Sequence, residues 1–98
     1  MTRLQGLYLV VDPTMPHRRL LDVVEKALKG GVDVLQLWKA WQDRHEILRL
    51  ARRLRNLANE YDVPLIVNND IQLAKDIEAN GVHMDGYDII PKKFTRKP

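Results

Sequence analysis

Residues Val63–Met84 read VPLIVNNDIQLAKDIEANGVHM. The stretch opens with Val63–Val67, which is apolar at every position, as is typical of a buried parallel strand. A polar cluster at 68–70 then precedes Ile71–Ile77, whose apolar residues follow helical spacing. A short apolar strand, Val82–Met84, closes the stretch. This strand–helix–strand order predicts a parallel βαβ unit.

The preceding part of the chain repeats the pattern. Leu7–Val11 and Val32–Trp38 are predicted strands, and the helix between them is expected to begin near Pro16. A longer helix is expected over Asp43–Tyr61, with Glu46 three residues after Asp43 as in a capping box. Four strands alternating with three helices predict an α/β fold of parallel βα units. An open doubly wound sheet and a segment of a barrel both fit this order.

Length and composition limit the domain organisation and the function classes. The chain has 98 residues, and we expect one domain over residues 1–91 and a basic tail over 92–98. The net charge of +3 comes from dispersed basic residues, so no nucleic-acid partner is expected. The absence of cysteine excludes disulfides and thiolate metal sites. No apolar run approaches a membrane span or a secretory signal, so a cytoplasmic protein without membrane contact is expected.

Polar residues gather where the predicted strands end. Ligands of parallel α/β folds bind at the carboxyl ends of the strands. No glycine-rich dinucleotide fingerprint follows the first strand, which argues against a nucleotide cofactor. The polar residues at or just past the strand ends are Asp12, Gln36, Lys39, Asn68, Asn69, Asp70, Asp85 and Asp88.

Carboxylates converging from adjacent strand ends are ligands that Mg²⁺ uses, together with substrate phosphates. Asp70, Asp85 and Asp88 are the candidates, although Asp70 also fits a helix cap and Asp85 a turn. Asn68 and Asn69 carry amides that donate to and accept from one ligand edge, as an aminopyrimidine requires, or they serve as cap and turn residues.

Two further side chains are candidates on the strands themselves. Gln36 shares a face with Trp38, opposite to Leu35 and Leu37, and its amide needs a partner from a ligand or a neighbouring strand. His83 fits either a core residue or a base.

Four segments carry a resemblance to a known family: Leu7–Asp12, Lys29–Leu37, Val63–Asn68 and Asn80–Met84. In this order they resemble thiamine phosphate synthase, whose superfamily also contains a related thiazole tautomerase. The resemblance implies that the chain is the first half of a TIM-type βα barrel of about twice this length. It also implies a reaction in which an aminopyrimidine diphosphate loses pyrophosphate and a thiazole phosphate captures the pyrimidine cation, with Mg²⁺ holding the pyrophosphate.

The resemblance assigns roles to individual residues. Gln36, Asn68 and Lys39 would bind substrate, and Asp88, Asn69 and Asp70 would hold Mg²⁺. Lys39 stands one position before the family's lysine. Asp70 stands one position after the family's metal-binding aspartate.

This sequence departs from the family pattern in four places. Asp85-Gly86 stands where the family has a Gly-Gln pair. Trp38 stands where the family has an arginine, Ala40 replaces a lysine, and Asn69 replaces a metal-binding aspartate. Three interpretations stay open: an enzyme completed by a homo-oligomer or a partner half-barrel, a relative that binds phosphorylated ligands without turnover, and a truncated remnant.

Overall fold

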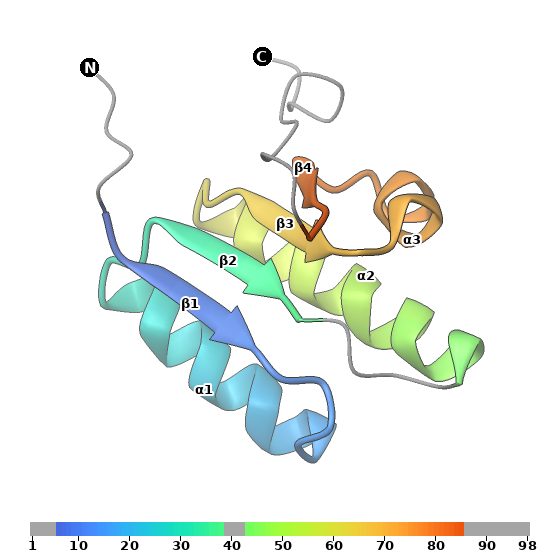
Figure 1. Ribbon diagram of the computed structural model, residues 1–98. Helices are drawn as coiled ribbons and strands as arrows, with labels where there is room; N and C mark the ends of the chain where they lie inside the picture. The colour runs from blue at the N-terminus through green and yellow to red at the C-terminus, as the bar shows by residue number, and fades with distance from the viewer. Residues whose placement is uncertain (1–5, 39–42, 86–98) are drawn as a thin grey trace.

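The computed structural model describes residues 6–38 and 43–85, and within them a single parallel sheet carries three helices (Figure 1). The strand order is β1-β2-β3-β4, and every neighbouring pair is parallel. The predicted order of strands and helices is therefore confirmed. The strands are β1 (Tyr8–Val11), β2 (Val34–Leu37), β3 (Leu65–Asn68) and β4 (Gly81–His83); the helices are α1 (His17–Lys29), α2 (Arg44–Glu60) and α3 (Ile71–Asp76).

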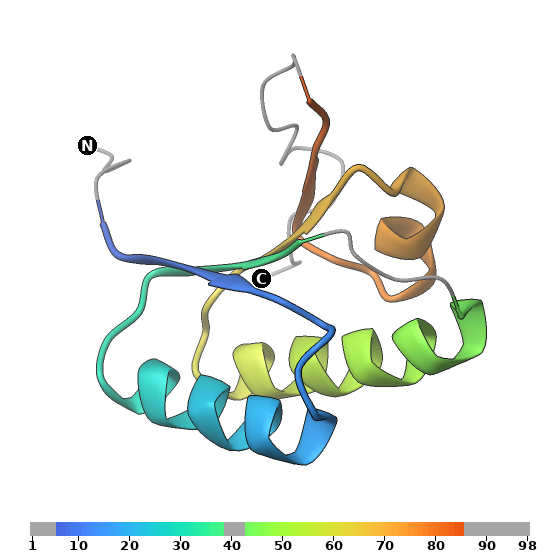
Figure 2. The same ribbon diagram turned by 60° about the horizontal axis from the view of Figure 1, so that its bottom comes forward.

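The sequential strand order selects the barrel segment over the doubly wound sheet. A doubly wound sheet reverses its strand order and carries helices on both faces. Here α1 and α2 lie below one face of the sheet, α3 continues around the same side, and the opposite face carries no helix of the described residues (Figure 2). The fold is the first half of a βα barrel.

The strand ends differ slightly from the predicted ones. β2 begins at Val34 rather than Val32, because the Val32 N–H still donates to the carbonyl of Ala27 and completes the turn after α1. β3 begins two residues later than predicted and includes Asn68. The parity of the strands, which decides the face each side chain occupies, is unaffected.

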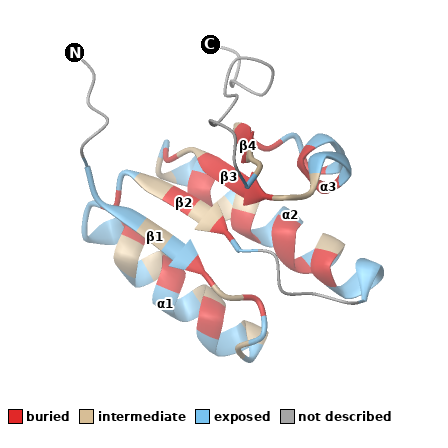
Figure 3. Ribbon diagram, in the orientation of Figure 1, coloured by how far each residue is buried: buried red, intermediate tan, exposed pale blue. Residues whose placement is uncertain are grey.

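The core lies between the helices and the covered face of the sheet (Figure 3). In α1 the buried residues recur every four positions, and α2 buries a wider apolar stripe. The strand residues that face these helices are aliphatic and fully buried, as expected for a sheet packed under βα crossovers. They are Val11, Leu35, Leu37, Leu65, Val67 and Val82.

The opposite face of the sheet is uncovered in the described structure. Tyr8 and Val10 are 44% and 57% exposed, and Trp38 is 48% exposed. Gln36 pairs with Val10 and Ile66 in the register, so it lies on this face, as the predicted alternation with Leu35 and Leu37 requires.

α2 begins at a side-chain cap, whereas Pro16 before α1 makes no side-chain cap hydrogen bond. Asp43 accepts hydrogen bonds from the N–H groups of His45 and Glu46, which confirms the predicted start of α2. Among residues 6–38 and 43–85 no helix is both long and apolar enough to cross a membrane.

Candidate functional site

The candidate site lies at the carboxyl end of the sheet on its uncovered face. Asn68 ends β3 and pairs in register with His83, which ends β4. Gln36 lies in the row before them, next to Ile66. Of the predicted substrate-binding residues, Gln36 and Asn68 are thus brought to one face, whereas Lys39 lies outside the described residues.

Asn68 is the one polar residue that is buried within the described part of the chain, at 6% exposure. Its Oδ1 accepts a hydrogen bond of 3.1 Å from Asn69 Nδ2, and its Nδ2 lies 3.3 Å from His83 Nδ1. These contacts give both polar atoms of the buried amide a hydrogen-bond partner. Each atom of the amide still has one hydrogen-bonding direction left.

Asn69 forms the turn that follows β3. Its φ of 55° lies in the left-handed region, which asparagine tolerates better than most residues. Its N–H donates to the carbonyl of His83 at 2.8 Å, and its Oδ1 accepts from the N–H of Asp85 at 2.9 Å. Asn69 therefore ties the end of β3 to the end of β4.

Gln36 and Trp38 occupy the middle of the uncovered face. Gln36 is partly exposed, and no described residue forms a hydrogen bond with its amide. Trp38 presents a half-exposed indole on the same side, where the family resemblance implies an arginine. This part of the site can hydrogen-bond and stack on a planar ligand, but Trp38 supplies no charge for a phosphate.

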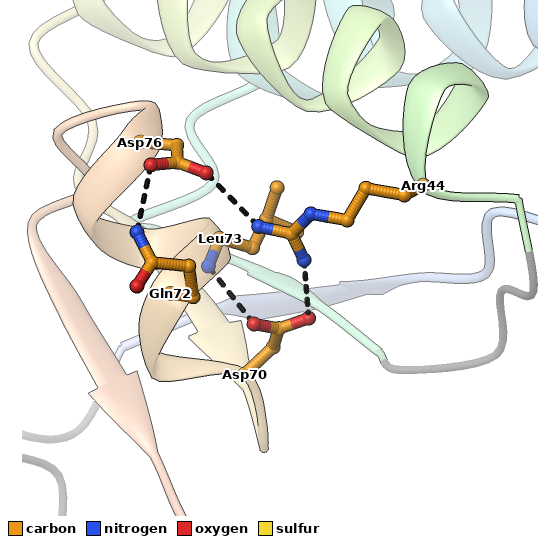
Figure 4. Close-up of polar contacts among 5 residues, drawn as sticks. All are labelled: Arg44, Asp70, Gln72, Leu73 and Asp76. Carbon is orange, nitrogen blue, oxygen red and sulfur yellow. Dashed lines mark hydrogen bonds and ion pairs between the residues drawn. The ribbon is translucent and has the colours of Figure 1, made fainter.

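Asp70 is a helix cap, one of its two predicted alternatives. Its Oδ1 accepts from the N–H of Leu73 at 2.9 Å, which satisfies the start of α3. Its Oδ2 lies 3.2 Å from Arg44 Nη1, and Figure 4 shows the arginine reaching from the start of α2 to Asp70 and Asp76. Both oxygens of Asp70 are thus engaged within the protein.

Arg44 is not among the residues that the sequence predicts for the site, yet it forms ion pairs beside the site. Its Nη2 lies 2.9 Å from Asp76 Oδ2, and Gln72 Nε2 donates to the other oxygen of Asp76 at 2.9 Å. The hydrogen bond from Gln72, followed by that from Arg44, holds the pKa of Asp76 below its usual value. The position of Arg44 in the sequence indicates an acidic partner, since a cation in the first turn of a helix is unfavourable without one.

Asp12, at the end of β1, also has a local role. Its Oδ1 accepts hydrogen bonds from the N–H and the hydroxyl of Thr14 at 2.9 and 2.7 Å. These two bonds, the backbone one first, lower the pKa of Asp12. The residue stabilises the turn after β1.

The described residues do not by themselves fit a Mg²⁺ ion. Within 6–38 and 43–85 no group of three or more histidine or carboxylate side chains could hold a metal. Asp70 is engaged by its cap and by Arg44, and the Asn69 oxygen accepts from Asp85. The remaining predicted ligand, Asp88, lies outside the described residues, so the metal site stays a prediction.

Comparison with known proteins places the chain in a family. The family model described as thiamine monophosphate synthase matches residues 7–97. A thiamine-phosphate synthase of Halalkalibacterium halodurans is 43% identical over 82 residues, which are 84% of this chain and 38% of that protein. One from Methanobrevibacter smithii is 37% identical over 91 residues, 93% of this chain and 43% of that protein.

A solved structure agrees with these relatives. Thiamine phosphate pyrophosphorylase from Pyrococcus furiosus superposes with a TM-score of 0.68 at 26% identity, covering 79% of this chain and 37% of that one. The chain spans about two fifths of the length of the proteins it matches. By sequence and by fold, the chain belongs to the thiamine monophosphate synthase family.

Proposed function

We propose that the chain provides the pyrimidine-binding half of a thiamine phosphate synthase-type site. The observation that carries the proposal is the placement of Asn68, buried on the uncovered face with its amide held by neighbours, one row from Gln36. The held amide of Asn68 and the unpaired amide of Gln36 on the same face can pair with the amino group and ring nitrogen of an aminopyrimidine.

The bound substrate would be an aminopyrimidine diphosphate. Its carbon–oxygen bond breaks, pyrophosphate leaves with the electron pair, and the nitrogen lone pair of a thiazole phosphate forms the new carbon–nitrogen bond. In this scheme Gln36 and Asn68 orient the ring, while Lys39 would offset the negative charge of the diphosphate. Mg²⁺ held by Asp88, with Asn69 or Asp70, belongs to the proposal on the family resemblance alone.

The reaction needs a second βα half over the uncovered face. Barrels commonly bind phosphate with the loops after their seventh and eighth strands. The half-exposed apolar side chains of Tyr8, Val10 and Trp38 are what a barrel interior would cover. A second copy of the chain or a partner half-barrel would supply that cover, and a cytoplasmic location is part of the same proposal.

A second candidate is ligand binding without turnover. Trp38 favours it, because an indole in place of an arginine removes a bidentate phosphate contact from the centre of the face. Under this alternative the pyrimidine still binds and the diphosphate is not activated.

The test combines product formation with ligand-dependent stability. The purified protein is mixed with the aminopyrimidine diphosphate, the thiazole phosphate and Mg²⁺, and thiamine phosphate is sought by mass spectrometry. We expect product that is lost in Gln36→Ala and retained in Gln72→Ala, a matched change on the exposed surface of α3.

Thermal unfolding separates the alternatives. A ligand at 100 times its Kd stabilises the native state by about 2.7 kcal/mol. Stabilisation by the diphosphate without product supports the binding relative. If folded protein shows no product and no stabilisation by the diphosphate, both proposed functions are overturned. The chain would then be a remnant without either activity.

A further inference from the structure

We propose that Asn69 sets the direction of hydrogen bonding through Asn68 to His83, so that His83 presents an N–H donor at Nε2 on the uncovered face. The edge of the site at β4 then takes a ligand atom that accepts a hydrogen bond, such as an unprotonated ring nitrogen. An N–H donor at this edge favours ligands that present an acceptor there over ligands that present a donor.

The direction of the chain of bonds follows from one backbone group. The N–H of Asp85 can only donate, so the atom of Asn69 that lies 2.9 Å away is the amide oxygen. The amide nitrogen of Asn69 therefore faces Asn68, at 3.1 Å. Because that nitrogen also only donates, the atom of Asn68 it meets is the oxygen Oδ1.

The same logic reaches the histidine. With its oxygen turned to Asn69, Asn68 directs Nδ2 to His83 Nδ1, 3.3 Å away. Nδ2 can only donate, so Nδ1 accepts and carries no hydrogen. In the neutral ring the hydrogen is then on Nε2. The ring is partly exposed, and Nε2 has no hydrogen-bond partner among residues 6–38 and 43–85.

A carboxylate at position 69 would keep the bond from Asp85 and reverse the two bonds that follow, from Asn69 to Asn68 and from Asn68 to His83. It would accept from the N–H of Asp85 with one oxygen and present another acceptor to Asn68. The Asn68 amide would turn to donate to it, its oxygen would face His83, and Nδ1 would have to carry the hydrogen. Nε2 would become an acceptor. The family resemblance implies an aspartate at this position, so Asn69 inverts what this edge offers a ligand.

The tautomer of His83 is measured directly by long-range ¹H–¹⁵N correlation spectra of the imidazole rings. The spectra are recorded on ¹⁵N-labelled protein at a pH high enough that the ring signals no longer move. His83→Gln assigns the signals of His83 against those of His17 and His45. We expect the wild type to carry its hydrogen on Nε2 and Asn69→Asp to carry it on Nδ1.

Asn80→Asp is the matched control. Asn80 Oδ1 accepts from the N–H of Leu65 at 2.9 Å, so the carboxylate keeps that bond and adds the same charge without touching Asn68. We expect this variant to retain the wild-type tautomer. A wild type with its hydrogen on Nδ1 overturns the proposal even if no variant folds, and so does a folded Asn69→Asp protein whose tautomer is unchanged.

The inference deepens the proposed function, but its first test needs no ligand, so the two fail separately. Titration with an aminopyrimidine then tests the edge itself. We expect the His83 Nε2 signal to shift in the wild type as the ring nitrogen binds. Saturating ligand that leaves this signal unmoved would overturn the assignment of the edge to the ligand.

Discussion

The two faces of the sheet differ in chemistry although they share the same four strands. The covered face is built only of aliphatic residues, which are buried except for the partly buried Leu9. The uncovered face mixes half-exposed apolar residues with polar ones. Its members are Tyr8, Val10, Val34, Gln36, Trp38, Ile66, Asn68 and His83, of which Ile66 and Asn68 are buried.

The difference separates stability from function. The covered face supplies the buried apolar area that holds the fold together. The uncovered face contributes less to that core and gathers the amides and the imidazole at its carboxyl end. An apolar strand face without cover belongs to a barrel interior, where layers of side chains meet those of other strands.

Two adjacent valines of β1 test this separation most strongly. Val11 is 2% exposed on the covered face, and Val10 is 57% exposed on the other. We expect Val11→Ala to lower the free energy of unfolding by about 2 kcal/mol, from lost burial and the cavity left behind. Val10→Ala in the dilute protein should change it by less than about 0.5 kcal/mol. Urea denaturation measures both; equal effects would remove the distinction between the faces.

A charge on the uncovered face tests its proposed cover. If a second copy closes the barrel, Val10→Asp buries a carboxylate in the interface and weakens self-association at least about tenfold, or roughly 1.4 kcal/mol. Val23→Asp is the control, because Val23 is 43% exposed on α1. Sedimentation equilibrium gives the dissociation constants. A wild type that stays monomeric at all concentrations would rule out a second copy as the cover.

Substitutions of Asp70 test whether this carboxylate stabilises the fold or binds a metal at the site. Asp70→Ala removes the cap of α3 and should cost about 1 kcal/mol of stability in thermal unfolding. Asp70→Asn keeps an oxygen for the N–H of Leu73 and should cost less, since it loses only the pair with Arg44. Because both oxygens of Asp70 are engaged, we expect Asn69 rather than Asp70 to accompany Asp88 in the proposed Mg²⁺ site, so neither change should alter stabilisation by Mg²⁺. A loss of Mg²⁺ stabilisation in Asp70→Asn would restore Asp70 as a ligand.

The fold could be predicted because its signals are local. Apolar runs marked the strands, and alternation put Gln36 and Trp38 on one face and Leu35 and Leu37 on the other. Exact strand ends were less predictable. Val32 is as apolar as a strand residue, but its N–H is taken by the turn after α1.

The polar contacts of the site were not predictable in the same way. Which residue of β4 lies opposite Asn68 depends on strand register, and alternation gives a face but no register. The sequence alone therefore fits His83 either as a core residue or as a base. Arg44 reaches Asp70 and Asp76 across 26 and 32 positions of sequence, a distance that no local pattern spans.

Changes around Asp76, which contacts Arg44 and Gln72, should have the smallest effect on stability. These side chains are exposed and lie on the helices rather than on the sheet. Hydrogen bonds from Gln72 and then Arg44 lower the pKa of Asp76 from 3.8, so the folded state favours the carboxylate. That contribution is complete above the unfolded value and is lost as pH falls through the folded one, a window below about pH 4. Gln72→Ala and Arg44→Ala should each raise the pKa of Asp76, because each removes a hydrogen bond to the carboxylate, as followed by carboxyl ¹³C titration. Lys26→Ala, which breaks the exposed pair with Asp22, should leave it unchanged. An unchanged pKa of Asp76 in either variant would mean that the hydrogen bond removed there does not support this carboxylate in solution.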